Sequence, residues 1–206
     1  MALTTYSDLK TSVANYLARS DLTSQIPDFI QLAEIRLRRE LRIRQMLSST
    51  NLTTTGGVGT VNLPSDFLEV KNIFVDGDPT YTLEYLTPSS LERNGRTYEA
   101  GRPTRYTVQA STLKFSPEPD TTYTIPLLYY AAPAFLSDSN TSNVFMANCP
   151  DLLLYGSLAE AEPYLMNDAR LAVWQAMYDR GLLALRESDD RGEYSASPLV
   201  MTVLAR

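Results

Sequence analysis

Charged side chains that could do chemistry are concentrated in one short stretch of this chain. Five arginines, Arg36, Arg38, Arg39, Arg42 and Arg44, lie within nine residues, although the whole chain carries a formal charge of -6. Such a cluster can bind the phosphates of a nucleic acid, form a solvated helix surface, or pair with carboxylates at a protein interface. Which of these three interpretations applies depends on the secondary structure that positions the arginines.

The rest of the sequence offers no set of residues for catalysis. It contains no histidine, which excludes histidine-based acid–base pairs, triads and metal ligands. The single cysteine, Cys149, therefore has no histidine base, and we expect it to be a small buried packing residue. The glycines of residues 55–60 lack the Lys-Ser/Thr pair of a phosphate-binding loop. We expect no enzyme activity, no catalytic residue, no cofactor and no metal.

Composition and charge indicate a folded, soluble protein made in the cytosol. A sequence pI near 4.7 argues against a protein whose main task is to bind phosphates. One cysteine allows no intrachain disulfide, which fits a reducing compartment. The first residues resemble no signal peptide, and no apolar run approaches the roughly 20 residues of a membrane span.

Hydrophobic spacing predicts an α+β chain in which a β-rich module interrupts a helical part. Residues 1–47 and 134–187 carry apolar residues at intervals of three and four, so we expect them to pack as one discontinuous helical bundle. Residues 48–133 are rich in Thr, Val, Tyr and Phe between Gly and Pro, which predicts an inserted antiparallel β-rich module. Residues 188–206 are predicted to be an extended C-terminal tail.

Local signals place the ends of the helices. Thr5 and Asp8 resemble a capping box for the first helix, and Ser24 can cap a second helix with Pro27 in its first turn. A helix that starts at Pro150 should end or kink near Pro163. Asn167 is expected to cap a last helix that dissolves after Glu187. Its apolar stripe comprises Leu171, Trp174, Tyr178, Leu182 and Leu185.

The β-rich module shows three strand-like runs near its end. Residues 104–109, 112–117 and 122–130 are predicted to be successive strands of a meander. Pro126 cannot donate a backbone hydrogen bond, so we expect its strand to lie at a sheet edge or to carry a bulge. A short helix is predicted over residues 88–93.

A helical wheel over residues 27–46 divides the charges of the arginine stretch between two faces. One arc is an ordinary polar face, made of Gln31, Glu34, Arg38, Arg42 and Gln45. The opposite arc is apolar, but Arg36, Glu40 and Arg44 lie within it at intervals of four. This spacing predicts a ladder in which Glu40 pairs with both arginines.

A ladder of paired charges within an apolar arc favours a protein interface, because an unpaired charge in a partly dry surface is costly. A solvated helix and a nucleic-acid contact remain as alternatives, although the nearby carboxylates dilute the positive charge. The predicted interface residues are Arg36, Arg38, Glu40, Arg42 and Arg44.

Six blocks of the sequence, taken in order, resemble the head-to-tail adaptor proteins of tailed bacteriophages, which are also called connectors or tail tubular A-like proteins. The resemblance covers about residues 3–187. The blocks are DLTSQIPDFIQLAEIRLRRELRIRQM, LPSDFLEVKNI, LEYLTPSSLE, GRPTRYTV, LKFSPEPDTTYTIPLLYYAAPAFLSDSNTSN and CPDLLLYGSLAEAEPYLMND.

The resemblance implies a structural virion protein, made in the host cytoplasm, that acts at the head–tail interface. Such adaptors form a ring, typically a dodecamer, between the portal protein and the tail or nozzle protein. Double-stranded DNA passes through the ring without specific binding. The resemblance implies no catalytic residue and no membrane partner.

Two further expectations concern binding. The alternative function is a tail-associated module that recognises a surface glycan through stacking tyrosines of the β-rich module. These are Tyr81, Tyr85, Tyr106, Tyr123, Tyr129 and Tyr130. The apolar, β-prone end of the chain, residues 198–206, either adds a strand to a neighbouring subunit or partner or is a disordered terminus.

Overall fold

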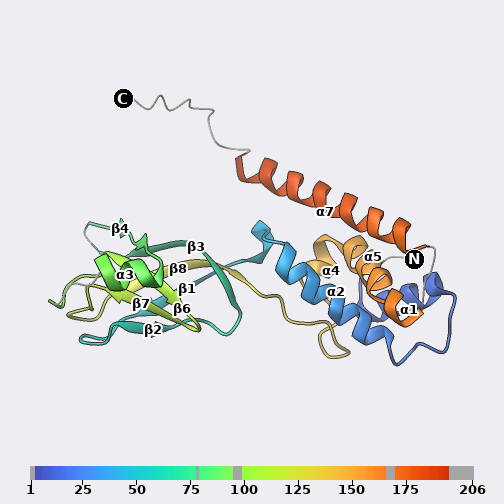
Figure 1. Cartoon of the computed structure of the whole chain (residues 1–206), viewed down its shortest axis with the longest axis horizontal. Coiled ribbons are helices and arrows are strands. Elements are labelled where there is room, and N and C mark those ends of the chain that lie inside the picture. The colour runs from blue at the N-terminus through green and yellow to red at the C-terminus, as the bar shows by residue number, and fades with distance from the viewer. Residues whose placement is uncertain (1–2, 78, 95–98, 166–169, 195–206) are drawn as a thin grey trace. The chain divides into compact units, whose positions relative to one another are not determined.

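The computed structural model describes residues 3–77, 79–94, 99–165 and 170–194 (Figure 1). The chain divides into two compact units. A helical unit comprises Met1–Gln45 and Pro133–Arg206, and a β unit comprises Met46–Ala132. The chain is therefore α+β, as predicted, with helices and two sheets in which most strand pairs are antiparallel.

Helix α1 (Tyr6–Leu17) begins at the predicted capping box. The Thr5 hydroxyl accepts a hydrogen bond from the Asp8 amide at 3.2 Å, and the Asp8 carboxylate accepts one from the Thr5 amide at 3.0 Å. On its apolar face Tyr6, Leu9, Val13 and Leu17 are buried, whereas Tyr16 is 47% exposed. The helix ends at Ala18, which adopts the left-handed conformation with φ 53°.

Helix α2 (Ile26–Glu40) is shorter than predicted at both ends. Ser24 does not cap it, because the Ser24 hydroxyl bonds the Gln25 side chain and Gln25 occupies the cap position. The helix ends at Glu40, since Leu41 is extended with φ -106° and ψ 137°. Beyond it only a short 3₁₀ turn, η1 (Arg44–Met46), is present.

The early end of α2 has a clear physical reason. Leu41 and Ile43 are both fully buried, while Arg42 is half-buried and Arg44 exposed. Inward and outward side chains that alternate with a period of two are typical of extended backbone, not of a helix. The wheel over residues 27–46 was therefore wrong beyond Glu40.

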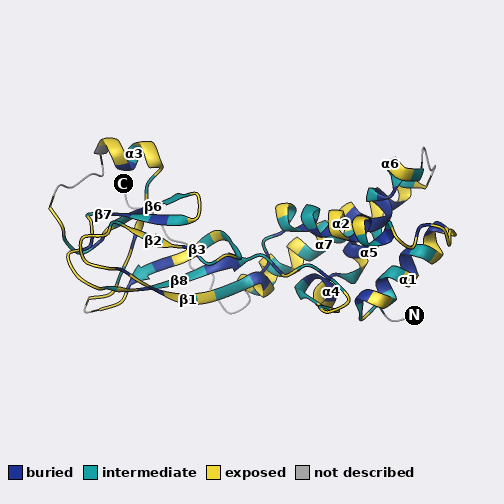
Figure 2. Ribbon diagram, turned by 90° about the horizontal axis from the view of Figure 1, so that it is seen from below, coloured by how far each residue is buried: buried dark blue, intermediate teal, exposed yellow. Residues whose placement is uncertain are grey.

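Helix α5 (Pro150–Glu160) is apolar almost all round and is surrounded by other helices (Figure 2). It follows α4 (Val144–Asn148), ends close to the predicted break at Pro163, and is succeeded by the single turn α6 (Glu162–Leu165). It packs against α1, α2 and α7 (Leu171–Tyr194). The absence of a side chain at Gly156 allows this approach, since a Cβ there would lie 3.2 Å from the Ala33 Cβ and 3.3 Å from the Tyr178 ring.

Helix α7 packs through two aromatic residues of the predicted apolar stripe, and it is longer than predicted. Trp174 and Tyr178 are buried, whereas Leu182 and Leu185 are only half-buried. The helix continues past Glu187 to Tyr194, so the predicted extended tail is wrong for residues 188–194. The predicted cap Asn167 and the rest of the tail lie outside the described residues.

The β unit contains two four-stranded sheets whose facing side chains form one core. The first has the order β1-β8-β3-β4, with β1 (Leu47–Thr53), β8 (Thr124–Ala131), β3 (Phe67–Val75) and β4 (Tyr81–Thr82). The second has the order β2-β7-β6-β5, with β2 (Thr60–Asn62), β7 (Thr112–Ser116), β6 (Arg105–Gln109) and β5 (Glu84–Tyr85). The short helix α3 (Pro88–Asn94) occurs where it was predicted.

The predicted meander is correct for its first two strands and wrong for the third. β6 and β7 form an antiparallel hairpin around Ala110, which has φ 52°. β8 instead lies in the other sheet, between β1 and β3, so Pro126 is on a central strand and not at an edge. The Cα pairs of β8 with β3 stop at Leu127, so Pro126 stands just beyond that ladder, where a missing N–H is tolerated.

The left-handed residue at the end of α1 gives a stability prediction. Ala18→Gly should raise the free energy of unfolding by about 1 kcal/mol, because a Cβ is strained in this conformation. The matched variant Ala14→Gly, in the interior of α1, should lower it by about 1 kcal/mol. Chemical denaturation of the full chain measures both, and a destabilised Ala18→Gly chain would contradict the prediction.

Candidate functional site

A cluster of charged and aromatic side chains joins α2 to α7 at the predicted interface residues Arg36 and Glu40. Arg36 Nε donates to Glu40 Oε1 at 3.0 Å, and the Tyr178 hydroxyl donates to Glu40 Oε2 at 2.8 Å. The Arg36 guanidinium lies over the Tyr178 ring, 4.0 Å from its centroid. One carboxylate therefore holds a cation and a phenol from two different helices.

Two more side chains complete the surroundings of Arg36. Its Nη1 lies 3.2 Å from Gln175 Oε1 on α7 and 3.7 Å from Glu160 Oε1 on α5. Burial raises the pKa of Tyr178, and its hydrogen bond to Glu40 raises it further. Burial lowers the pKa of Arg36, but the Glu40 hydrogen bond and the neighbouring charges outweigh it, so the pKa is raised overall. Arg36 stays charged and Tyr178 stays neutral at ordinary pH.

The outer side of this cluster is a groove of about 310 Å³. It is lined by Leu32, Arg36, Arg39, Glu40 and Glu160. Leu32 is 44% exposed, and Arg39 bonds the Ile35 carbonyl of its own helix at 3.3 Å. An exposed leucine beside two arginines and two carboxylates offers a partner protein both apolar contact and charge pairs.

Arg44 does not join Glu40 as the predicted ladder required. Because the helix ends at Glu40, Arg44 turns to α7, where its backbone amide and its Nε each donate to Asp189 Oδ1 at 3.1 Å. Its guanidinium also fills the space beside Gly192, where an added Cβ would overlap it. Arg186 reaches back from α7 and donates to the Glu40 carbonyl at 2.7 Å, at the exposed C-terminal end of α2.

The predicted polar face of α2 is not an ordinary solvated face. Glu34 is buried and accepts hydrogen bonds from the Leu136 amide at 3.1 Å and from Asn143 Nδ2 at 2.6 Å. Arg38 lies over the Phe135 ring, 3.4 Å from its centroid, and donates to the Pro133 carbonyl. This face therefore fastens residues 133–143 to α2.

Arg42, the last predicted interface residue, serves the backbone at the end of the helix. Its Nη1 donates to the Arg38 carbonyl at 2.8 Å and to the Leu41 carbonyl at 2.6 Å. The structure thus brings Arg36 and Glu40 together, whereas Arg38, Arg42 and Arg44 each lie in a different local setting. Glu160, Gln175 and Asp189 were not predicted as partners of these arginines, because they lie far from them in the sequence. Tyr178 was noted only as part of the apolar stripe.

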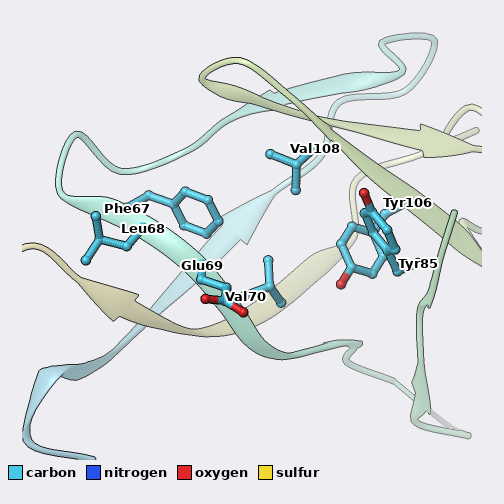
Figure 3. Close-up of a pocket in the computed structure, with 7 residues that line it drawn as sticks. All are labelled: Phe67, Leu68, Glu69, Val70, Tyr85, Tyr106 and Val108. Atoms are coloured by element: carbon cyan, nitrogen blue, oxygen red, sulfur yellow. The ribbon is translucent and has the colours of Figure 1, made fainter. Parts of the chain in front are cut away.

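The tyrosines of the β unit mostly belong to its core. Tyr106, Tyr129 and Tyr130 are buried, and Tyr81 and Tyr123 are half-buried. Tyr85 is the exception, with 52% of its surface exposed. It projects beside a groove between β3 and the strands β5 and β6 (Figure 3). A glycan-stacking surface built from the six predicted tyrosines is therefore reduced to one exposed ring.

Cys149 is buried, as expected of a packing residue. Burial, assisted by the charge of Asp151, raises the pKa of its thiol to about 12. Within the described ranges no three or more metal-ligating side chains come together. No helix in that part of the chain has the length and apolar character to span a membrane.

Comparison with known families identifies the chain's relatives. The sequence profile of the SU10 adaptor protein family matches residues 4–202. The chain therefore belongs to the SU10 adaptor protein family, a family of phage head–tail adaptors. This confirms the resemblance to such adaptors and makes the chain a structural phage protein, a component of the virion. No curated protein matches the chain.

The shared carboxylate gives a prediction for the stability of the helical unit. Glu40→Ala should lower the free energy of unfolding by about 2 kcal/mol, because the Tyr178 hydroxyl and Arg36 lose their acceptor. Tyr178→Phe should then cost little more in the Glu40→Ala chain. Glu187→Ala, on the exposed side of α7, should change stability by less than about 0.5 kcal/mol and serves as the control. Equal losses for Glu40→Ala and Glu187→Ala in chemical denaturation would contradict the prediction.

Glu34 gives a prediction for pH dependence. Burial raises its pKa above the ordinary 4.5, against the opposing hydrogen bonds from Leu136 and Asn143. As pH rises above 4.5, the unfolded carboxyl ionises first, so the folded state binds more protons and the free energy of unfolding falls.

The stability of wild type minus that of Glu34→Gln should consequently decrease as pH rises from about 4 to about 7. Denaturant titrations of both chains at several pH values measure this difference, and the subtraction cancels the other carboxyls. A difference that is constant with pH, or that grows, would show that Glu34 does not carry the effect.

Proposed function

We propose that this chain forms a ring that joins the portal protein of a tailed phage to the tail or nozzle and lets double-stranded DNA pass. The observation that carries the proposal is the family match, which extends over residues 4–202 and thus over both units. By the same resemblance the ring contains twelve copies and acts at the head–tail interface of the virion. The chain is made in the host cytoplasm.

The helical unit supplies a rigid docking body in this proposal. The two ends of the chain act as one helical bundle around α5. Its support is the all-round burial of α5 and its packing against α1, α2 and α7. A body of this kind can carry a surface groove to a partner without first becoming ordered, which lowers the entropic cost of docking.

The groove on α2 is the proposed contact with a neighbouring copy or with the portal. Arg36 and Glu40 line it and are already paired, so a partner can cover them without burying an unpaired charge. The other three arginines stabilise the elements around the groove. Arg38 holds residues 133–143, Arg42 holds the end of α2, and Arg44 holds α7.

The arginines of this stretch are suited to holding protein and not to holding DNA. Arg36 pairs with carboxylates, Arg38 and Arg42 donate to backbone carbonyls, and Arg44 pairs with Asp189. The chain as a whole carries a formal charge of -6. A wall with this balance repels phosphates, which supports a conduit along which the duplex slides without specific binding.

Mass measurement of the purified chain, alone and mixed with portal protein, tests the proposed function. We expect a closed ring on the portal. Leu32→Asp should weaken association at least about tenfold without unfolding the chain, since Leu32 is 44% exposed. Val58→Asp, at 45% exposure in the β unit, is the matched control and should assemble normally. A chain that stays monomeric and never joins the portal would overturn the proposal.

A further inference from the structure

The β unit contains a second groove that the proposed docking through α2 does not use. Its volume is about 400 Å³, and it lies between β3 of one sheet and β5 and β6 of the other (Figure 3). Apolar and aromatic side chains dominate its lining. The lining residues are Phe67, Leu68, Glu69, Val70, Tyr85, Tyr106 and Val108.

The shape of β3 opens this groove. The pairing of β3 with β8 shifts register between Phe67 and Glu69 and again between Val70 and Asn72, which marks two bulges. Bulges bend a strand and re-aim its side chains, so consecutive residues of β3 line the same hollow. On the other side of β3, β4 pairs with Phe74 and Val75, which are two of its nine residues. The groove therefore runs along a strand whose outer edge is only partly covered.

The chemistry of the groove suits an extended apolar peptide. Val70 and Val108 provide aliphatic walls, and the rings of Tyr85 and Tyr106 meet edge to face with centroids 5.5 Å apart. Tyr106 is buried, so Tyr85 is the ring that a ligand can cover. Strand addition at such an edge gives affinity through the backbone and specificity through pockets for alternate side chains.

The end of this chain has the matching sequence. Residues 198–206, PLVMTVLAR, carry no charged side chain before Arg206. In an extended strand Leu199, Met201 and Val203 share one face, and that face is entirely apolar. The twelve residues after Tyr194 can span at most about 40 Å when fully extended.

We propose that the groove beside β3 accepts residues 198–206 of a second copy of this chain as an added strand. The inference rests on the proposed ring, in which each copy lies next to another, and it names a contact that would link neighbours through the β unit. The occupant is the tail of another copy; a tail folded back within one copy and a glycan are outcomes that the test distinguishes.

Disulfide trapping between two full-length variants tests the proposal. One chain carries Tyr85→Cys in the groove and the other, of different mass through a tag, carries Met201→Cys. We expect a mixed disulfide dimer upon mild oxidation at high protein concentration. Val58→Cys replaces Tyr85→Cys as the control, because Val58 is similarly exposed at a turn of the same unit, and it should trap the tail at least about tenfold less. Native Cys149 is buried and common to all chains.

A second change in the tail separates strand addition from chance collision. Val203→Pro, added to the Met201→Cys chain, should abolish trapping, because proline cannot donate to a strand ladder. Equal trapping with Tyr85→Cys and Val58→Cys, or trapping that survives Val203→Pro, would overturn the proposal. So would a monomeric crosslink in a chain that carries both cysteines, diluted to prevent contact between copies.

The outcome also separates this inference from the proposed function. A chain that forms rings on the portal but gives no mixed disulfide would refute the groove and leave the ring intact. A chain that neither assembles nor crosslinks would refute both. Specific binding of a glycan that Tyr85→Ala abolishes, without any mixed disulfide, would replace the peptide occupant with a sugar.

Discussion

The helical unit depends on the burial of one short helix, α5. Its side chains are apolar almost all round, so it must be covered on several sides, and no single neighbour can do this. The cover comes from α1 and α2, which precede the β unit in the chain, and from α7, which follows it. Because Gly156 has no side chain, α2 and α7 can both pack closely against α5. The hydrophobic effect thereby brings both ends of the chain into one unit and leaves the β unit as an insertion between them.

The charged residues of α2 act on top of this packing. Glu40 holds Arg36 and Tyr178, Glu34 holds residues near 136 and 143, and Asp189 on α7 holds Arg44. Apart from the Arg36–Glu40 pair within α2, each of these contacts joins segments that are distant in the sequence, so the polar contacts help to orient helices that apolar burial brings together. The groove beside Leu32 is lined by two arginines and two carboxylates, of which Arg36 and Glu40 are already paired. That combination supports the docking role proposed above for this member of a phage adaptor family.

Several elements could be predicted because their signals are local. The capping box of Thr5 and Asp8, the start of α5 at Pro150 and the hairpin of β6 and β7 depend on residues only a few positions apart. The end of α2 was missed, although the alternation of Leu41 and Ile43 with arginines was visible in the sequence. Over so few residues a helical pattern and an extended pattern cannot be distinguished. The burial of both Leu41 and Ile43 favoured the extended backbone. The place of β8 between β1 and β3 could not be predicted, because strand order depends on contacts between distant segments.

The sequence by itself determined the α+β class, the family and the concentration of arginines in one stretch. These properties depend on composition, periodicity and the order of motifs, which need no knowledge of distant contacts. Only the tertiary structure decided what each arginine does. Arg36 and Glu40 pair as neighbours on one helical turn, but Tyr178 and Glu160 join them from other helices, and Arg44 leaves them for Asp189. The reason is physical: each charge takes the partner that the packing of α2, α5 and α7 brings within reach, and that packing is a property of the whole unit.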